Sequence, residues 1–365
     1  MSLARDIADL GSVTSRLDTL GASNRNIIIN GGQIVDQRNS GSAITLTSSH
    51  QYATDRFICR LGTSSSSTAQ RVADAPDGLY NSVKITIGTG ATPSAATATG
   101  YFAYKTEGLD TSHLKFGSSD AQTITLSFYV KSSLTGSFGV TVANDALDRS
   151  FPSSYTINSA NTWERKSITV TGDTSGTWAT TNAAAFYLLW DLGCGSDVKG
   201  TANTWAGSDF RGGATGTINV CATSSATWQI TGVQMEIGSE VTDFEHRSYG
   251  DELQRCKRYF EAYAPITNDD GSINVWRTRT SVNNYNGIVH FLEKRVQPTC
   301  TLDYDRLHKP GVAKDTLSNI SITIGSGQTQ SCTVNCTPDN DSTISTSAFL
   351  GKNSGTGKVT LDAEL

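Results

Sequence analysis

A succession of short strand-like segments separated by turn residues constrains the fold of this chain most strongly. Between Asn26 and Arg247, runs rich in β-branched and aromatic residues alternate with turns rich in glycine, serine and asparagine, as in consecutive β-strands. The predicted strands are Ile27–Ile29, Ser82–Ile87, Tyr101–Lys105, Thr123–Lys131, Ser137–Asn144, Glu164–Thr171, Ala185–Asp191, Thr217–Thr223 and Trp228–Ile237. This number of strands in one run predicts a jelly-roll β-sandwich over 24–248.

The segment 228–264 predicts how this sandwich ends. Apolar residues alternate from Trp228 to Ile237, and the alternation changes phase at Gly232, as at a β-bulge. Gly238 then ends the strand. A linking helix is predicted over 249–264 by apolar residues at helical spacing, namely Leu253, Cys256, Phe260 and Tyr263.

A second run of strand-like segments after Pro265 predicts a smaller C-terminal β-sandwich over 265–365. The predicted strands are 273–280, 287–293, 299–304, 318–324, 331–335, 345–350 and 358–363. Hydrophobic residues make up 37% of the chain and charged residues 17%, and 34 glycines suit many turns between short strands. The fold class is therefore mainly β. The sequence does not distinguish a receptor-contacting tip from a trimerisation module in this part.

The N-terminal segment 1–23 is predicted to form a short helix with one apolar seam. The seam consists of Leu3, Ile7, Leu10 and Leu17. A helix of this length that contains Gly11 is not stable alone, so we expect it to form when the apolar seams of several copies pack together. The alternative is a helix that docks on its own domain.

Composition argues against several other classes of protein. The net charge is −5, from 29 basic and 34 acidic residues, whereas nucleic-acid binders usually carry a basic field. This charge balance does not favour nucleic acid as a partner. No window predicts a secretory signal or a membrane span, so membrane insertion is not expected. Seven cysteines, an odd number in a long chain, predict buried free thiols rather than a disulfide scaffold.

Several short motifs occur along the chain, namely Asn26–Gly32, Gln37-Arg38, Tyr52–Phe57, Ile230–Gly238, Thr242–Arg247, Cys256–Phe260 and Leu361–Leu365. Together they resemble the motifs of bacteriophage tail fibre and receptor-binding virion proteins. The resemblance implies a jelly roll similar to a carbohydrate-binding module, a homotrimer, and a virion location after assembly in the host cytoplasm. It also implies that segment 1–23 attaches to other phage structural proteins. Cys256, Phe260 and Tyr263 are then expected to pack between modules or subunits.

No motif in the chain predicts catalysis. The nucleophile elbow, the Walker loop and the zinc-protease helix motif are absent from the sequence, and the five histidines do not lie at metal-ligand spacing. The chain is therefore not expected to be an enzyme, and no cofactor is expected. A structural Ca²⁺ is compatible with the acids Asp36, Asp55 and Glu236 if they converge at the sandwich edge.

Sugar binding needs an aromatic face together with polar side chains that hydrogen-bond hydroxyl groups. Trp178 and Trp205 lie in long polar loops, where an exposed apolar ring would be unusual without a use. The candidate glycan-binding residues are Trp205, Asp209, Phe210, Arg211 and Trp178, followed by Trp276 and Tyr285. The alternative is that these loops fold over the sandwich and bury their rings as lids or at a subunit contact.

The sequence as a whole favours a non-enzymatic phage virion protein. The interpretation is a homotrimeric tail fibre that binds host-surface glycan through several weak sites at once. Two alternatives remain open at this point, a capsid decoration or head fibre protein and a polysaccharide depolymerase.

Overall fold

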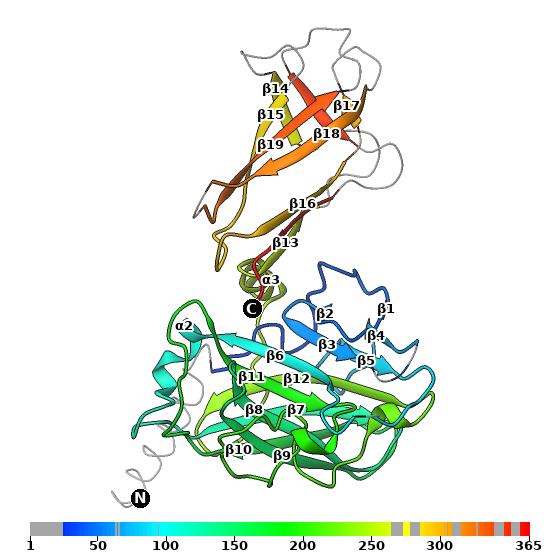
Figure 1. Cartoon of the computed structure of the whole chain (residues 1–365), viewed down its shortest axis with the longest axis vertical. Helices are drawn as coiled ribbons and strands as arrows, with labels where there is room; N and C mark the ends of the chain where they lie inside the picture. The colour runs from blue at the N-terminus through cyan, green and yellow to red at the C-terminus, as the bar shows by residue number, and fades with distance from the viewer. Residues whose placement is uncertain are drawn as a thin grey trace, which may run out of the picture. The chain divides into compact units, whose positions relative to one another are not determined.

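The structure is a computed structural model. It describes residues 25–365 except 63, 65, 94, 264–272, 278–284, 305, 309–314, 326–327, 339–346 and 352–357. The predicted helical segment 1–23, with Leu3, Ile7, Leu10 and Leu17, lies outside the described residues. The chain divides into two compact units (Figure 1). The N-terminal unit contains the described residues up to Ile34, together with Thr45–Gln51 and Cys59–Arg247, and the C-terminal unit contains Val35–Ile44, Tyr52–Ile58 and Ser248–Leu365.

Two six-stranded sheets form a β-sandwich, with strand orders β1-β4-β5-β12-β7-β10 and β2-β3-β6-β11-β8-β9 (Figure 1). The strands are β1 Ile44–Thr45, β2 Gln51–Thr54, β3 Phe57–Leu61, β4 Thr68–Val72, β5 Ser82–Thr86, β6 Gly100–Glu107, β7 Ile124–Ser132, β8 Gly136–Asn144, β9 Ser150–Ile157, β10 Glu164–Val170, β11 Ala184–Asp191 and β12 Thr227–Ile237. Short helical turns are α2 Gly108–Thr111, η1 Ser112–Leu114, η2 Ser196–Val198 and η3 Val220–Ala222. The prediction of a mainly β sandwich is confirmed.

Two predicted strands are wrong. Ile27–Ile29 forms no strand. The Ile27 N–H donates to the Met235 carbonyl at 3.0 Å, and the chain then turns over 29–32. Thr217–Thr223 instead contains the 3₁₀ turn η3. In both segments the apolar side chains that suggested a strand are buried by tertiary packing, as for Ile28 and Val220, which are fully buried.

The core between the two sheets is aromatic. The Trp228 ring lies 5.5 Å from Phe102, and the Trp190 ring lies 5.5 Å from Phe128. Because the Trp228 indole N–H donates to the Tyr155 hydroxyl at 3.0 Å, these large rings are buried without leaving that donor unpaired. The core placement of Trp190 and Trp228 gives the two sheets a common apolar layer.

The predicted bulge in β12 is confirmed. Its register against β7 shifts between Thr231 and Gln234, and Gly232 has a φ of +59°. A Cβ at this position would approach the Tyr129 ring to 2.8 Å, so both backbone conformation and space require glycine. Beyond the bulge, residues 25–31 rather than β5 bond to β12. The Val233 N–H donates to the Gly31 carbonyl at 3.0 Å.

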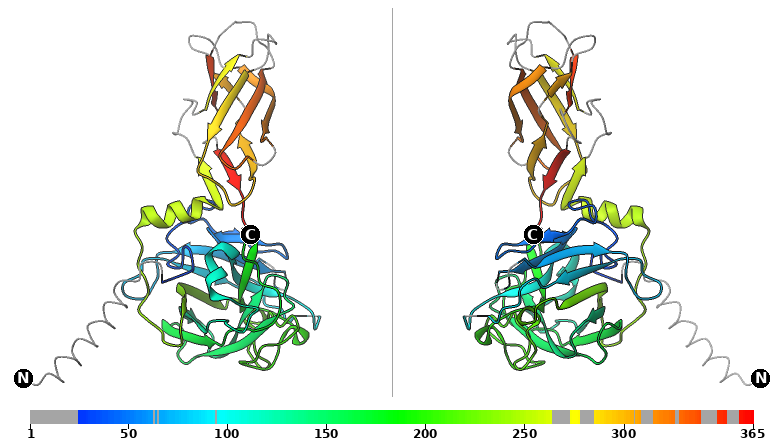
Figure 2. Two further views of the ribbon diagram at one scale, coloured as in Figure 1. Left: turned by 90° about the vertical axis from the view of Figure 1, so that its left-hand side faces the viewer. Right: turned by 90° about the vertical axis from the view of Figure 1, so that its right-hand side faces the viewer.

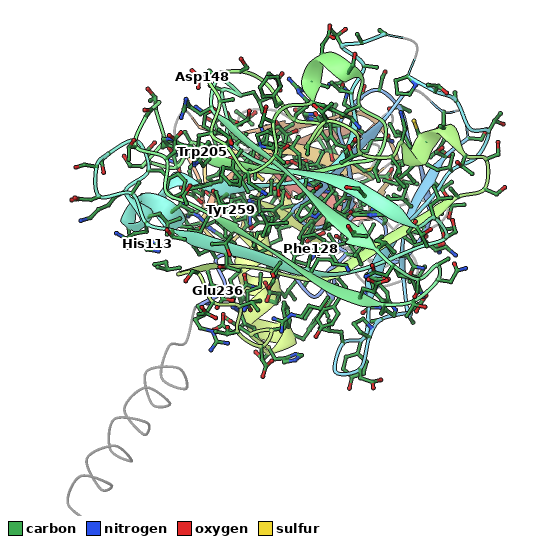
Figure 3. The ribbon with its side chains drawn as sticks, turned by 90° about the horizontal axis from the view of Figure 1, so that it is seen from below. His113, Phe128, Asp148, Trp205, Glu236 and Tyr259 are labelled. Carbon is green, nitrogen blue, oxygen red and sulfur yellow. The ribbon has the colours of Figure 1, made fainter. Side chains whose placement is uncertain are left out.

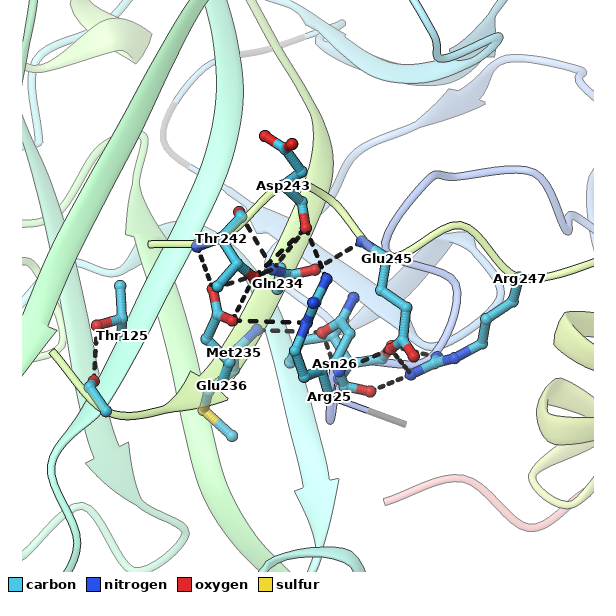
Figure 4. Close-up of polar contacts among 12 residues, drawn as sticks. Arg25, Asn26, Thr125, Gln234, Met235, Glu236, Thr242, Asp243, Glu245 and Arg247 are labelled. Carbon is cyan, nitrogen blue, oxygen red and sulfur yellow. Dashed lines mark hydrogen bonds and ion pairs between the residues drawn. The ribbon is translucent and has the colours of Figure 1, made fainter. Parts of the chain in front are cut away.

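Polar side chains of β12 hold the segment 242–247 that follows it (Figure 4). The Glu236 carboxylate accepts from the Thr242 hydroxyl at 2.6 Å and from the Gln234 amide at 3.0 Å. The Gln234 side-chain oxygen accepts from the Glu245 N–H at 2.8 Å. Gln234 and Glu236 are buried, and these bonds satisfy polar groups that would otherwise be costly to desolvate.

The same segment is tied to Asn26 (Figure 4). The Glu245 carboxylate accepts from the Asn26 N–H at 2.7 Å and pairs with Arg247 at 3.2 Å. The Asn26 side chain donates to the Val233 carbonyl at 3.0 Å and accepts from the Met235 N–H at 3.1 Å. Hydrogen bonds therefore join the motif Asn26–Gly32 to the motif Thr242–Arg247 and to β12.

The C-terminal unit begins with a helix that is shorter than predicted. Helix α3 spans Tyr249–Lys257, and the Ser248 side chain caps it by accepting from the Asp251 N–H. Residues Phe260–Tyr263 form strand β13 and pair with β21 (Lys358–Asp362), so the predicted continuation of the helix to 264 is wrong. Strand pairing replaces helical hydrogen bonds here, and the apolar spacing fitted both conformations.

The strands of this unit form a closed barrel and a small sheet. The barrel order is β14-β15-β19-β18-β17-β20, and the three-stranded sheet has the order β13-β21-β16 (Figure 2 shows the strands from two sides). The remaining bounds are β14 Ile273–Arg277, β15 Tyr285–His290, β16 Thr299–Asp303, β17 Arg306–His308, β18 Asp315–Thr323, β19 Ser331–Pro338 and β20 Ser347–Gly351. The barrel core includes Tyr285, Val334 and Leu350.

All seven cysteines are free thiols and six of them are buried, as the cysteine count predicted. No helix in the described part of the chain is long and apolar enough to cross a membrane.

A buried cluster of charges joins four distant segments of the C-terminal unit. The Arg56 guanidinium pairs with the Glu364 carboxylate, and both side chains are less than 5% exposed. Arg56 also lies 3.5 Å from the centre of the Tyr259 ring, and Arg38 lies 3.5 Å from the centre of the Phe260 ring. The motifs that contain these residues therefore meet in one place.

Glu364→Gln is expected to lower the free energy of unfolding by about 3 kcal/mol, because it leaves the buried Arg56 charge without its counter-ion. Denaturant unfolding measures this loss, with the exposed Glu293→Gln as a matched control. Adding Arg56→Met to Glu364→Gln is expected to recover part of the stability. Equal stability of Glu364→Gln and wild type would show that this ion pair does not stabilise the unit.

Asp55 gives the C-terminal unit a pH dependence. Burial raises the pKa of Asp55 to about 6 from 3.8, although two hydrogen bonds from Gln37 oppose the shift. Because the folded-state pKa is the higher one, this contribution to stability is complete below about pH 4 and is lost as the pH rises through about 6.

The stability difference between wild type and Asp55→Asn is therefore expected to shift by about 2 kcal/mol against wild type between about pH 4 and about pH 7. Urea unfolding of both proteins across this range measures the shift. A difference that stays constant with pH would contradict the raised pKa.

Candidate functional site

Trp205 and Trp178 belong to a cluster of aromatic rings. The Trp205 ring lies 5.3 Å from Phe151 and 5.7 Å from Trp178, and its indole N–H donates to the Thr171 carbonyl at 2.7 Å. Trp178 is 9% exposed, whereas Trp205 is half-buried. Figure 3 shows Trp205 and Asp148 on the same side of the N-terminal unit. These contacts favour a structural role for both rings over the sugar contact that the sequence suggested, and Trp205→Ala below tests the choice.

The loop 195–216 is fixed on the outward face of β8 and β9. Ser150 and Ala206 exchange two backbone hydrogen bonds, of 3.0 and 2.9 Å, and the Thr141 hydroxyl donates to the Phe210 carbonyl at 2.7 Å. A Cβ at Gly139 would lie 2.4 Å from the Gly212 carbonyl oxygen, so glycine permits this close approach. The loop is therefore part of the folded surface.

The predicted residues Asp209, Phe210 and Arg211 lie on this loop with different surroundings. Arg211 and Asp209 form an ion pair, in which the guanidinium Nε lies 2.9 and 3.0 Å from the two carboxylate oxygens. The Phe210 ring packs against Gly200, where a Cβ would approach it to 2.4 Å. Of the three, Arg211 has the position best suited to contact a ligand.

The second candidate group does not form a site among the described side chains. Tyr285 is fully buried in the barrel core, so it offers no ring face to a sugar, and this part of the prediction is wrong. The side chain of Trp276 lies outside the described residues. Cys256 and Phe260 are buried within the C-terminal unit of one chain, and the side chain of Tyr263 is not described. Their predicted role between subunits stays a prediction.

A cluster of tyrosines and cations lies beside Arg211 on the outward face of the sheet that contains β6 and β11. We call it the tyrosine–cation site, and it consists of His50, Arg60, Tyr101, Lys105, Tyr187 and Arg211. The Tyr187 hydroxyl donates to the Tyr101 hydroxyl at 3.1 Å, and the Tyr101 hydroxyl lies 2.8 Å from His50 Nε2. This hydrogen-bonded chain runs from β11 across β6 to the loop before β2.

The cations of this site cover the two buried tyrosines. Lys105 Nζ lies 4.7 Å from the centre of the Tyr187 ring and pairs with Asp145 at 2.6 Å. Burial acts to lower the pKa of the Arg211 guanidinium, but its bonds to Asp209, together with the neighbouring Tyr101, raise that pKa above its usual value. Because Tyr101 and Tyr187 are buried, the charged side chains and not the tyrosine rings are available to a ligand at the surface.

His50 is an uncharged member of the site at neutral pH. Partial burial lowers the pKa of its imidazole, and the positive charges of Lys105, Arg60 and Arg211 lower it further. A neutral ring can accept a hydrogen bond from Tyr101 at Nε2 and keep a proton on Nδ1. The site therefore combines hydrogen-bond donors with an excess of positive charge.

The three acids considered for Ca²⁺ have protein partners of their own. Asp36 accepts from the Asn39 and Gly41 N–H groups, Asp55 accepts from Gln37, and Glu236 accepts from Thr242. Within the described residues, no three His, Cys, Asp or Glu side chains are grouped as metal ligands.

Sequence reasoning found Arg211 but missed the other members of the tyrosine–cation site. Tyr101 and Lys105 lie four positions apart on one strand, which predicts a common face but not whether that face is the core or the surface. Tyr187 joins them only because β11 pairs with β6, with Tyr187 opposite Lys105. Lys105 was the signal that this face points outward, because an unpaired lysine is rarely buried.

Comparisons with known proteins give structural neighbours only. No protein-family model and no curated protein sequence matches the chain. The enzymatically active domain of tailspike protein 4 of bacteriophage CBA120 is similar at 12% identity and a TM-score of 0.30, over 59% of this chain and 22% of that chain.

Two carbohydrate-binding modules are also similar. A family 4 module matches at 17% identity and a TM-score of 0.29, over 57% of this chain and 98% of that chain. The family 11 module of Clostridium thermocellum, in complex with a β-1,3-1,4-mixed-linked tetrasaccharide, matches at 13% identity and a TM-score of 0.26, over 56% and 98%. Similarity at this level assigns no function to the chain.

Trp205→Ala is expected to lower the free energy of unfolding by about 2 kcal/mol, because a half-buried indole loses its ring contacts and its bond to Thr171. Glycan binding is expected to stay unchanged. Denaturant unfolding and a binding assay on the same preparation measure the two effects. If Trp205→Ala is as stable as wild type but no longer binds glycan, Trp205 contacts the sugar.

Proposed function

We propose that this chain is a non-catalytic adhesion protein of a bacteriophage particle, namely a homotrimeric tail fibre that binds host-surface glycan at the tyrosine–cation site. The observation that carries the proposal is the set of donors at this site. His50, Lys105 and Arg211 lie beside two hydrogen-bonded tyrosines. Arg60 lies on β3, the strand next to β6, and its charge acts on His50. Convergent donors on a rigid sheet suit the recognition of sugar hydroxyl and acid groups.

The ion pairs of the site favour binding over hydrolysis. Glycosidases need two carboxyl groups that flank the scissile bond, and one of them must hold a proton. The acids beside this site, Asp145 and Asp209, are each paired with a cation, Lys105 and Arg211. Such carboxylates hold the cations in place and are poorly suited to act as general acids.

Trimer formation would strengthen a weak site. The sequence resemblance to trimeric fibres and the apolar seam in segment 1–23 support this part of the proposal. Three identical sites on one particle-bound protein raise the effective concentration of the second and third contacts, so each single contact can be weak.

Replacing both His50 and Lys105 by alanine is expected to weaken binding to host cells by about tenfold or more, because two donors of the site are lost. Flow cytometry with labelled trimer measures the binding, and Lys115→Ala, an exposed lysine elsewhere on the N-terminal unit, serves as the control. If the correctly folded double variant binds host cells as tightly as wild type does, the glycan-binding site lies elsewhere on the protein.

Three further measurements test the rest of the proposal. Immunogold labelling of virions is expected at the tail, and labelling of the head would replace the tail fibre with a head fibre. Light scattering is expected to give the mass of a trimer. Incubation with host polysaccharide is expected to release no new reducing ends, and sustained release would establish a depolymerase.

A further inference from the structure

Arg60 has no counter-ion among the residues that the structure describes. It lies on β3 between Cys59 and Leu61, which are fully buried, and it is the one partly exposed residue of that strand. Because side chains alternate along a strand, Arg60 points to the outward face of the sheet. Its Nε is buried without a hydrogen-bond partner, and no ion pair joins Arg60 to any residue that the structure describes.

The other two permanent cations of the tyrosine–cation site are neutralised. Lys105 is paired with Asp145 and Arg211 with Asp209, which leaves the charge of Arg60 uncompensated. Burial is the main cause of the lowered pKa of His50, and the positive charges of Lys105, Arg60 and Arg211 lower it further, so all three cations act on the same imidazole. A partly desolvated guanidinium without a partner is costly in the free protein, and an anion that joins it recovers that cost.

We propose that the tyrosine–cation site selects an acidic glycan, in which a carboxylate or phosphate group on the sugar pairs with the Arg60 guanidinium. This inference rests on the proposed function and names its ligand class. The planar fork of arginine matches the two oxygens of either group, and Lys105 and His50 of the same site supply hydrogen-bond donors for sugar hydroxyls. A neutral sugar would leave the Arg60 charge unpaired, so the site discriminates by charge.

The test compares polymers that share a backbone and differ in charge. Polygalacturonate is measured against its fully methyl-esterified form, and a phosphomannan against the unphosphorylated mannan, by titration calorimetry at fixed ionic strength. Wild type is expected to bind at least one acidic polymer about tenfold or more tightly than its neutral partner. The two pairs distinguish a carboxylate from a phosphate ligand. Affinity is expected to fall with added salt.

Arg60→Gln is expected to abolish this preference, so that its affinity for each acidic polymer falls to its affinity for the neutral partner. Arg60→Lys is expected to retain part of it, because the charge stays and the fork is lost. Lys84→Gln, which removes a partly exposed charge from β5 in the other sheet, is the matched control and is expected to bind as wild type does.

His50 supplies an independent readout. In the free protein, Arg60, Lys105 and Arg211 repel a proton on the His50 imidazole, and the Tyr101 hydroxyl is hydrogen-bonded to the ring. A bound anion offsets this repulsion and favours the protonated imidazole. Binding to the acidic polymer is therefore expected to tighten as the pH falls from about 8 to about 5, and His50→Gln is expected to remove this pH dependence.

Equal affinity for acidic and neutral polymers, or an unchanged preference in Arg60→Gln, would overturn the inference and leave the proposed adhesion function intact. The same holds if wild type binds host cells or neutral polymers but none of the acidic ones. If wild type binds no glycan and no host cell, both the inference and the proposed function fail.

Discussion

The bulge at Gly232 is the constraint on which the organisation of the N-terminal unit depends. Before the bulge, β12 pairs with β5 on one side and β7 on the other. After it, β12 still pairs with β7, but the backbone groups on its other side bond to residues 26–31. One residue with positive φ thus ends one pairing and begins another, and the first described segment of the chain is fixed beside the last strand of the sandwich.

Two buried polar networks then hold segments that are far apart in the sequence. One joins Asn26 to Glu245 and Arg247, and the other joins Arg56 to Glu364. Buried charges contribute little net stability when they are paired and cost much when one partner is lost. Their physical effect is to make alternative pairings of the same strands unfavourable, so that the motifs specify one arrangement of the chain.

Sequence periodicity predicted the sandwich because strands such as Thr227–Ile237 alternate over many residues. It missed β2, β4 and β9. In β2 and β9, tertiary contacts bury polar residues such as Thr54, Ser150 and Ser153, which hides the apolar alternation. It also extended α3 to residues that pair with β21, since Cys256 and Phe260 fit a helical spacing as well as a strand. A local pattern does not show whether a distant strand will pair with a segment and replace its helical hydrogen bonds with strand hydrogen bonds.

The candidate site was predictable only in part for a similar reason. Polar loops around Trp178 and Trp205 suggested exposed rings, but Phe116 and Phe151, which lie far away in sequence, pack against them. Arg60 belongs to none of the predicted strands or candidate groups. Its lack of a partner is a property of the folded neighbourhood, and no sequence pattern carries that information.

The way in which residues 206–214 are attached has an evolutionary consequence. The bonds that fasten this segment to β8 and β9 use its main-chain groups, at Ala206, Ser208, Phe210, Gly213 and Ala214. The side chains of Asp209 and Arg211 make no bond to those strands. Mutations at these two positions can therefore change the chemistry at the rim of the site while the framework stays intact. Variants of these two residues can therefore arise without loss of folding.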